Sequence, residues 1–141
     1  MLNFLKIKSI KKYFTHEPVA VVYLFGSQAT GKTNHRSDYD FGVIFLENMS
    51  KKERFNKRLE YMGFLGKIVR CDNVEVIDLK ESPVFLQYSA IFPRKDIYIK
   101  DEKERIAFEH STLSSYFDRF FYLRRHTINS LATTAKEGLA I

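Results

Sequence analysis

Apolar residues recur along the chain with two different spacings, and together they predict four helices and four strands. Near the N-terminus, Phe4, Ile7, Ile10 and Phe14 are three or four residues apart, which is the spacing of one helix face. Residues 19–25 form an unbroken apolar run rich in β-branched side chains, which is typical of a strand buried on both faces. The predicted order of elements is α-β-β-α-β-α-β-α.

This order predicts an α/β (α+β) fold, in which helices flank a mixed sheet of about four strands. Ser50 and Glu53 have the spacing of a capping box, and Ser82-Pro83 place a cap residue before a proline at the first helical position. The apolar face expected for the helix after Pro83 comprises Val84, Phe85, Tyr88, Ile91 and Phe92. The predicted helices cover 2–14, Ser50 to near Gly63 or Gly66, Pro83 through Phe92, and 102–131; the predicted strands cover 19–25, 39–46, 74–79 and 96–100.

The last predicted helix is long for a domain of this size. As one straight rod, residues 102–131 would span about 45 Å at ~1.5 Å per residue. A compact domain of this length has a radius of gyration of only ~14 Å. Either the helix overhangs and its apolar stripe needs a partner, or it bends back onto the core near Ser111-Thr112 or Ser114-Ser115. The sequence leaves both alternatives open.

Composition sets the class of protein. At 141 residues, we expect one domain over residues 1–141, with 101–141 as a C-terminal helical extension. The single cysteine, Cys71, excludes a disulfide framework, and no apolar run is long enough for a transmembrane helix. The net charge is +6, but the lysines are spread along the chain rather than gathered in a block. We therefore expect a cytoplasmic protein that contacts neither membrane nor nucleic acid directly.

The segment after residues 19–25 matches two motifs. Gly26 to Thr33 fits the P-loop pattern G-x-x-x-x-G-K-[ST]. A P-loop, however, opens a long helix that crosses over to a parallel strand, and such a crossover needs at least about a dozen residues. Only four residues separate Thr33 from Asp38, where the next strand begins. The sequence therefore favours an antiparallel strand pair and disfavours a P-loop NTPase.

The second motif begins at the same glycine and ends in a pair of carboxylates. Gly26-Ser27 is followed, ten residues later, by Asp38-Tyr39-Asp40. Residues two apart on a strand point to the same face, so Asp38 and Asp40 would present their carboxylates together. Carboxylate oxygens bind Mg²⁺, and two such ions can hold the attacking and leaving oxygens of a phosphoryl displacement. Glu75, on the predicted strand 74–79, is the candidate for a third carboxylate at this site.

Asp78 is the other acidic residue on that predicted strand. It lies three positions after Glu75, so its side chain would face the opposite way unless a bulge intervenes. A role in a strand-end turn or cap is therefore favoured, although the sequence leaves open which of the two supplies the third carboxylate.

The Gly-Ser turn followed by Asp-x-Asp resembles the hallmark of the polymerase-β-like nucleotidyltransferase superfamily. More narrowly, the chain resembles the minimal nucleotidyltransferases (MNT), the antitoxins of HEPN/MNT toxin–antitoxin pairs. The likeness covers nearly the whole chain, and the block YLFGSQATG…SDYDFGVIF is its specific part. The resemblance implies that Gly26 and Ser27 contact the nucleotide phosphates, that Asp38 and Asp40 bind Mg²⁺, and that Glu75 occupies the third-carboxylate position.

Two positions depart from the family pattern. The family usually has Asp where this chain has Glu75, and often Arg where it has Thr30. The first change keeps the charge on a longer arm, and the second removes a cation that could contact phosphate. Lys32 or Arg36, on the same loop, are candidates to replace that contact, although they could equally be solvated loop charges.

The resemblance implies an Mg²⁺-dependent transfer of AMP from ATP to a hydroxyl, expected to be a tyrosine of a HEPN toxin, which would make the chain an antitoxin. Two alternatives remain: a nucleotidyltransferase for a small molecule such as an aminoglycoside, and a non-catalytic antitoxin that acts by binding. Arg119 and His126 also match the loose R-x6-H spacing of HEPN ribonucleases. That fold resembles a four-helix bundle, however, so we expect this match to be a coincidence.

Overall fold

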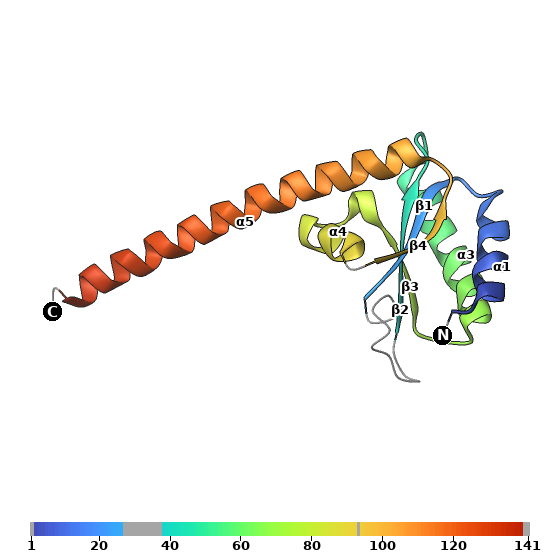
Figure 1. Cartoon of the computed structure of the whole chain (residues 1–141), viewed down its shortest axis with the longest axis horizontal. Helices are drawn as coiled ribbons and strands as arrows, with labels where there is room; N and C mark the ends of the chain where they lie inside the picture. The colour runs from blue at the N-terminus through green and yellow to red at the C-terminus, as the bar shows by residue number, and fades with distance from the viewer. Residues whose placement is uncertain (1, 27–37, 93, 140–141) are drawn as a thin grey trace.

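A mixed sheet of four strands, in the order β3-β2-β1-β4, forms the centre of the protein (Figure 1). β1 pairs antiparallel with both β2 and β4, whereas β2 pairs parallel with β3. The computed structural model of the protein describes residues 2–26, 38–92 and 94–139. The predicted mixed sheet is confirmed; its strands are β1 (Val19–Phe25), β2 (Tyr39–Phe45), β3 (Val74–Asp78) and β4 (Arg94–Ile99).

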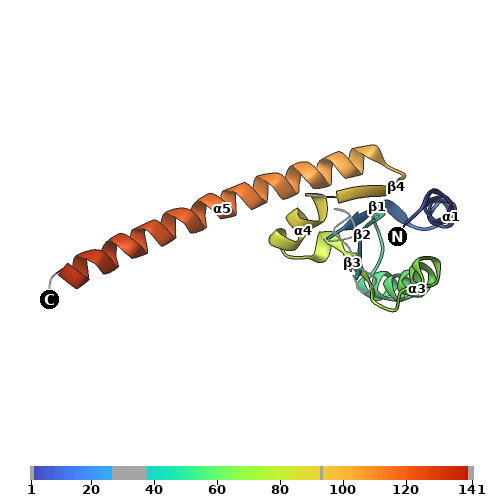
Figure 2. The ribbon, with the colours of Figure 1, turned by 60° about the horizontal axis from the view of Figure 1, so that its bottom comes forward.

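Helices cover both faces of this sheet. α1 (Phe4–Phe14) and α3 (Lys51–Val69) lie on one face, and α4 (Val84–Ile91) lies on the other with the first turns of α5 (Glu102–Leu139) (Figure 2). All seven residues of β1 are buried, as the apolar run predicted. A short 3-10 turn, Leu79–Glu81, connects β3 to α4.

From Val21 to Phe25, side chains of β1 alternate between two apolar cores. Val22 lies in one buried cluster with Phe14 of α1 and Tyr61 of α3. Tyr23 lies in the other, with Phe108 of α5. This alternation fixes which residues of the neighbouring strands face α4 and α5, and it is used below to place the acidic side chains.

The helix α3 begins as predicted but ends later than predicted. The Ser50 hydroxyl accepts a hydrogen bond from the backbone N–H of Glu53 at 3.1 Å, which confirms the predicted N-cap. Gly63 and Gly66 were expected near the end, yet the helix continues to Val69. The chain then leaves the helix through Arg70, in the left-handed region at φ 54°. Packing of the apolar face therefore outweighs the low helix propensity of the two glycines.

The helix α4 buries fewer of its aromatic side chains than the sequence predicted. Pro83 lies just before the helix, with ψ 152°, rather than at its first helical position. Ala90 and Ile91 are the buried residues, whereas Phe85 and Phe92 are 44% and 68% exposed. The expected apolar face is wrong at those two positions because α4 covers the sheet along one side only.

The helix α5 is a single continuous element that runs far beyond the sheet (Figure 1). Phe108 and Thr112 are buried against the body, whereas all residues from 117 to 138 are exposed. The overhanging alternative is therefore correct, and the predicted bend at Ser111-Thr112 or Ser114-Ser115 is absent from this described helix. No helix in the described part of the chain is both long and apolar enough to cross a membrane.

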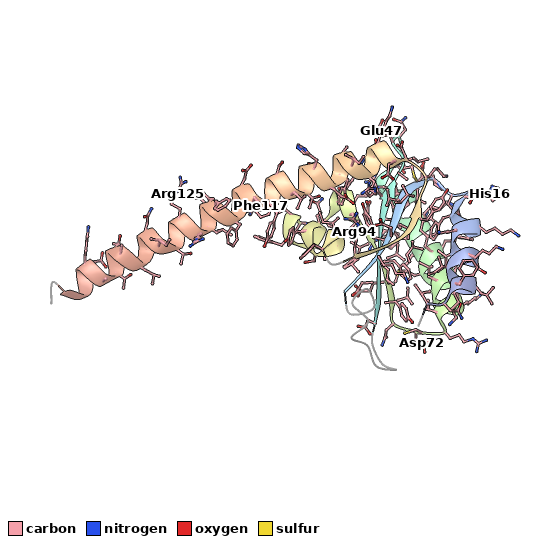
Figure 3. All side chains as sticks on the ribbon, viewed as in Figure 1. His16, Glu47, Asp72, Arg94, Phe117 and Arg125 are labelled. Carbon is pink, nitrogen blue, oxygen red and sulfur yellow. The ribbon has the colours of Figure 1, made fainter. Side chains whose placement is uncertain are left out.

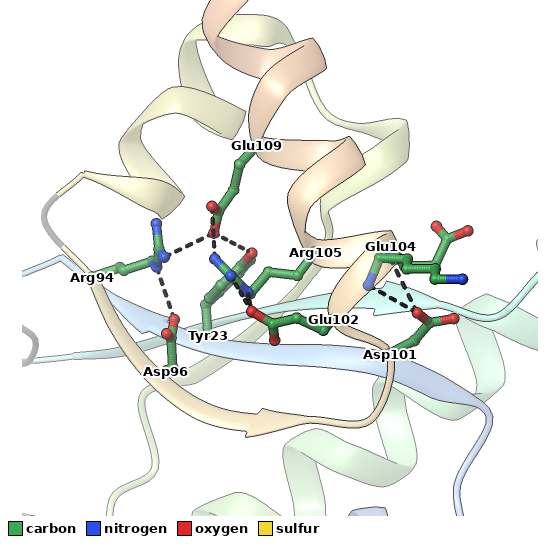
Figure 4. A network of polar contacts seen from close by, with 9 residues as sticks. Tyr23, Arg94, Asp96, Asp101, Glu102, Glu104, Arg105 and Glu109 are labelled. Atoms are coloured by element: carbon green, nitrogen blue, oxygen red, sulfur yellow. Dashed lines mark hydrogen bonds and ion pairs between the residues drawn. The ribbon is translucent and has the colours of Figure 1, made fainter.

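A network of polar side chains fastens the first turns of α5 to the sheet (Figure 4). The Glu109 carboxylate accepts a hydrogen bond from the Tyr23 hydroxyl at 2.9 Å, and it pairs with Arg94 and Arg105 at the same distance. The Arg94 guanidinium also lies over the Tyr23 ring, 5.4 Å from its centroid. Burial and the bond to Glu109 raise the pKa of Tyr23, so its hydroxyl stays a proton donor. Glu109 thus joins α5 to both β1 and β4 through polar contacts.

Replacing Tyr23 by Phe should lower the free energy of unfolding by about 1 kcal/mol, because one partly buried hydrogen bond is lost while both arginines still satisfy Glu109. Urea denaturation measures this change. A double-mutant cycle with Glu109→Gln should show coupling between the two sites. Tyr122→Phe is the matched control, since this tyrosine is 67% exposed on α5 and its hydroxyl should contribute nothing measurable. Equal effects of the two Tyr→Phe changes would contradict the role given to the network.

Candidate active site

The predicted catalytic carboxylates lie at one end of the sheet, where β1 ends and β2 and β3 begin. Asp38 immediately precedes β2, Asp40 is its second residue, and Glu75 is the second residue of β3. Asp72, just before β3, marks this end of the molecule, and Glu47, just after β2, marks the opposite end (Figure 3).

Strand pairing places Asp40 between the other two elements of the site. Across one side it pairs with Phe25 of β1, and across the other it pairs with Glu75 of β3. Phe25 belongs to the core beneath α4 and α5, and Ile77, two residues after Glu75, packs against that core. Asp40 and Glu75 therefore share the sheet face that carries α4, and the strand alternation assigns Asp38 to it as well.

Gly26 turns the chain directly beside the Asp40 carboxylate. Its φ is +72°, a conformation that residues with a side chain rarely adopt. A Cβ at this position would lie 2.8 Å from the Asp40 Oδ2 atom, too close for any unbonded contact. The backbone conformation thus favours glycine at the end of β1, and any side chain here would also have to displace the Asp40 carboxylate.

The electrostatic environment of Asp40 is that of a cluster of like charges. Partial burial raises the pKa of its carboxyl, and the charges of Glu75 and Asp38 raise it further. Such a raised pKa shows that the ionised form of Asp40 is disfavoured in the folded protein. A divalent cation would relieve this repulsion by supplying positive charge between the carboxylates.

The three acidic side chains are nevertheless not arranged as three ready ligands of one ion. Within the described ranges, no group of three or more His, Cys, Asp or Glu residues is placed to hold a metal. Mutual repulsion and the exposure of Glu75 account for this difference from the expected convergence. Mg²⁺ is usually held by one or two carboxylates together with substrate phosphates. Asp38 and Asp40 fit that smaller ligand set.

Part of the predicted site falls between β1 and β2 in the sequence. Ser27, Lys32 and Arg36, predicted to contact phosphate, lie outside the described residues, and so does Thr30. Their assignment stays a prediction. The P-loop alternative fails on the described strands, because β1 and β2 pair antiparallel, whereas a P-loop requires a crossover to a parallel strand.

Asp78 is a structural residue at the other end of β3. Its Oδ2 atom pairs with the Nε atom of Arg54 at 2.9 Å, and Arg54 comes from α3 on the opposite sheet face. Burial raises the pKa of the Asp78 carboxyl, and the charge of Arg54 opposes that rise. The alternation of side chains along β3 predicts that Asp78 faces away from Glu75, and its pairing with Arg54 agrees with this prediction. Arg119 and His126 both lie on the exposed half of α5 rather than at this site.

Arg94 is a neighbour of the site that no sequence pattern indicated. Phe25 pairs with Asp40 on one side and with Arg94 on the other, so the three residues lie side by side across three strands. Arg94 also pairs with Asp96 and Glu109, and thereby connects this end of the sheet to α5. Arg94 is distant in sequence from Phe25 and Asp40, and the three come together only when the sheet forms. A local motif therefore could not indicate this arrangement.

Replacing Asp40 by Asn should stabilise the metal-free protein at neutral pH. A raised native pKa means that the folded state holds this proton more tightly than the unfolded chain does. The free energy of unfolding therefore falls as pH rises from the ordinary carboxyl range through the native pKa. The increase in the free energy of unfolding caused by Asp40→Asn should be largest above the native pKa of Asp40, and it should shrink as the pH is lowered into the ordinary carboxyl range. Urea denaturation in EDTA at several pH values measures this; a gain independent of pH would contradict it.

The order of the sheet and the glycine turn beside Asp40 agree with the nucleotidyltransferase fold that the sequence predicted. The chain matches the family "Polymerase beta, Nucleotidyltransferase" over residues 8–103 and belongs to this family. The predicted superfamily and its fold are thereby confirmed.

Individual relatives point to one branch of the family. The chain is 28% identical over 100 residues to the protein adenylyltransferase MntA of Aphanizomenon flos-aquae (strain 2012/KM1/D3), which covers 67% of each protein. A chain of the crystal structure of a toxin–antitoxin with AMP-PNP superposes with a TM-score of 0.68 and 22% identity, over 92% of this chain and 98% of that one. A chain of the tri-AMPylated Shewanella oneidensis HEPN toxin in complex with MNT antitoxin superposes with a TM-score of 0.63 and 19% identity, over 90% of this chain and 96% of that one. The likeness to minimal nucleotidyltransferases is thus confirmed, and at these identities the solved structures establish the shared fold.

Proposed function

We propose that this chain is an Mg²⁺-dependent nucleotidyltransferase that moves AMP from ATP to a tyrosine hydroxyl of a HEPN-type toxin. The modification would neutralise the toxin, so the chain would be the antitoxin of a pair acting in the cytoplasm. The whole of residues 1–141 would form one functional unit, in which 101–141 extends the nucleotidyltransferase domain. Nucleic acid and membrane would take no part.

The single observation that carries this proposal is the juxtaposition of Gly26, Asp40 and Glu75. The absence of a side chain at Gly26 lets the backbone lie against the Asp40 carboxylate, at the point where the triphosphate and its Mg²⁺ would bind. Asp40 lies between that turn and Glu75, and partial burial, together with the negative charges of Glu75 and Asp38, raises the pKa of its carboxyl. Family membership and the named activity of the MntA relative support the same reaction class.

Bond changes in the proposed reaction are those of a phosphoryl displacement. The tyrosine hydroxyl oxygen attacks the α-phosphorus of ATP, a new O–P bond forms, and the bond to the β-phosphate bridging oxygen breaks, so that pyrophosphate leaves. Glu75, which is exposed beside Asp40, is the candidate to accept the hydroxyl proton. Ser27, Lys32 and Arg36 are the candidates to hold the triphosphate.

Asp38 and Asp40 would hold Mg²⁺, and two ions would bind at this site. When bound, this metal supplies positive charge that offsets the charge of the triphosphate and of the oxygens at the reacting phosphorus. The chain's own contribution is positional, because the strand fixes Asp40 and the turn at Gly26 fixes the backbone beside it. Positioning and charge are the main sources of catalysis in phosphoryl transfer.

The direct test combines the purified chain with ATP, Mg²⁺ and the HEPN-type toxin encoded beside it. Intact-mass spectrometry should show the toxin gaining adenylyl groups, and peptide mapping should place them on tyrosine. Addition of EDTA should prevent the gain. A toxin that is neutralised without any mass change would contradict the enzyme and support an antitoxin that acts by binding alone. Adenylylation of an aminoglycoside, with none of the toxin, would instead support the small-molecule alternative.

A further inference from the structure

Phe92 presents an exposed aromatic ring next to the candidate active site. It directly follows α4 and is 68% exposed. Its ring contacts Tyr88 of α4, with 6.3 Å between the ring centroids and 37° between the ring planes. A single exposed phenylalanine is ordinary on a protein surface, so its significance depends on where it lies relative to the catalytic carboxylates.

Strand pairing places Phe92 at the end of the sheet that holds Asp40. Arg94, the first residue of β4, pairs with Phe25, and Phe25 pairs in turn with Asp40. Paired strands are about 4.8 Å apart, so the backbones at Arg94 and Asp40 are separated by roughly 10 Å. Phe92 comes two residues before Arg94, at the end of α4 (Figure 1). Since α4 lies on the sheet face that carries Asp40, Phe92 and this carboxylate share one side of the sheet.

The backbone at Phe92 is held by hydrogen bonds on both sides. Its own N–H donates to the carbonyl oxygen of Tyr88 at 3.1 Å. The carbonyl oxygen of the residue before it accepts a hydrogen bond from the Nη1 atom of Arg94 at 3.3 Å. The Arg94 guanidinium is held in turn by Asp96 and Glu109, at 2.8 and 2.9 Å (Figure 4). A side chain on such a fixed backbone loses less conformational entropy when a ligand binds.

Within the proposed function, the side of Asp40 nearest Phe92 is left for the nucleoside. Glu75 lies on the β3 side of Asp40 and is assigned to the acceptor hydroxyl. The opposite side of Asp40, over the ends of β1 and β4, is therefore available to the nucleoside part of the nucleotide. The rings of Phe25 and Tyr39, at this end of β1 and β2, are buried and offer no face to a base. Phe92 is exposed there.

We infer that the Phe92 ring is the surface on which the base of the nucleotide stacks, and that the substrate is a purine nucleoside triphosphate. This inference rests on the proposed function, in which the triphosphate binds at Asp40. An aromatic side chain can stack on the π face that every base has. The two fused rings of a purine bury more apolar area on Phe92 than the single ring of a pyrimidine. Stacking alone does not distinguish adenine from guanine.

The test measures binding of two probes to the full chain by calorimetry, with Mg²⁺ and without toxin. AMP-PNP carries both a base and a triphosphate group, whereas inorganic triphosphate has no base. Phe92→Ala should weaken binding of AMP-PNP by about 10-fold or more, as expected when an aromatic side chain stacked on a base is removed. Its binding of inorganic triphosphate should be unchanged. Phe92→Trp keeps an aromatic ring and should bind AMP-PNP as tightly as the unaltered chain does.

Phe85→Ala is the matched control. Phe85 is 44% exposed at the other end of α4, where its ring contacts Tyr116 with 5.7 Å between the centroids. Its removal should leave the affinity for both probes unchanged. Phe85 and Phe92 both lie outside the two apolar cores, and circular dichroism checks that each variant is folded.

Base selectivity provides a second measurement. The unaltered chain should bind ATP and GTP more tightly than CTP and UTP. Phe92→Ala should reduce this preference for purines, because it removes the ring that distinguishes the bases by their area. A purine preference that Phe92→Ala leaves intact would overturn the inference.

Two results with the first pair of probes would also overturn it. Equal losses of affinity for AMP-PNP and inorganic triphosphate in Phe92→Ala would mean that the change disturbs the phosphate site. Unchanged affinity for AMP-PNP would mean that the ring does not contact the base, and a simultaneous loss of toxin binding would assign Phe92 to the toxin interface instead.

Failure of this inference and failure of the proposed function give different results. If only the stacking is wrong, Phe92→Ala transfers AMP to the toxin with an unchanged KM for ATP. If only the proposed reaction is wrong, the unaltered chain leaves the toxin's mass unchanged, yet Phe92→Ala still loses affinity for AMP-PNP and keeps it for inorganic triphosphate. We expect transfer by Phe92→Ala with a KM for ATP raised about 10-fold and kcat nearly unchanged, because stacking on the base is the same in the substrate and in the transition state.

Discussion

Replacing Asp40 by Asn should reduce transfer of AMP to the toxin by about 1,000-fold, while toxin binding stays unchanged. Asn keeps the shape of the side chain but removes the negative charge that would hold Mg²⁺. Loss of one preorganised electrostatic group at a reacting centre typically lowers the rate by about 100- to 1,000-fold. We expect a loss at the upper end of this range because Asp40 is held on a strand between Gly26 and Glu75.

The measurement is the initial rate of adenylylation by intact-mass spectrometry, at saturating Mg²⁺ and ATP. Glu47→Gln is the matched control, since it removes a carboxylate at the opposite end of the sheet and should leave the rate unchanged (Figure 3). The same Asn variant is expected to be more stable than the unaltered chain at neutral pH. If the variant is slower but more stable, its loss of rate arises from the chemical step and not from a loss of folded protein. Full activity in Asp40→Asn would contradict the catalytic assignment.

Glu75→Gln separates the two roles given to the acidic cluster. Glu75 is exposed, and in the proposal it accepts a proton rather than serving as a main metal ligand. Its removal should therefore lower the rate by less than the loss of Asp40, and the effect should shrink as pH rises and the hydroxyl ionises more readily. A loss as large as that of Asp40→Asn at every pH would assign Glu75 to the metal instead.

Most of the sheet and the position of the acidic cluster were predictable because both depend on local patterns. The apolar, β-branched run at 19–25 is typical of a strand with two buried faces, and the structure confirms this strand. The two-residue period of a strand places Asp38 with Asp40, and it turns Asp78 away from Glu75. The two-residue period of a strand was thus enough to predict which acidic side chains share one face of the sheet.

Other features depend on contacts between distant segments and could not be predicted. The bond from Tyr23 to Glu109 joins residues 86 positions apart, and no pattern near either residue indicates it. The helix α5 continues past the serines that suggested a bend, and next to them Tyr116 stacks on Tyr88 of α4, a contact between segments distant in sequence. The end of α3 was predicted near Gly63 or Gly66, but the helix continues to Val69 because packing of its apolar face sustains it past both glycines.

Replacing Gly26 by Ala should have the second-largest effect, and it should act on both stability and rate. The positive φ of Gly26 makes any side chain unfavourable by about 1–2 kcal/mol, which urea denaturation should detect. The new Cβ would also displace the Asp40 carboxylate, since it would lie 2.8 Å from Oδ2. A misplacement of about 1 Å at a reacting centre lowers rates by roughly 100-fold, and we expect a loss of that order.

Gly63→Ala is the matched control for this change. Apart from the neighbouring backbone of α3 itself, no atom in the described part of the chain lies within 4 Å of a Cβ placed at Gly63. Alanine there should stabilise the protein by up to about 1 kcal/mol through helix propensity and leave the rate unchanged. A slow Gly63→Ala variant would mean that glycine replacements disturb this fold in general rather than at the site.

A double variant shows whether Gly26 acts through Asp40. If the methyl group slows the reaction only by moving the carboxylate, then adding Gly26→Ala to Asp40→Asn should cause almost no further loss of rate. Its cost in stability should remain, because the strained backbone does not depend on the charge at position 40. Multiplicative losses of rate would instead mean that the turn contributes separately, by holding backbone groups that contact the triphosphate. The comparison therefore distinguishes a glycine that makes room for a carboxylate from one that itself receives the nucleotide.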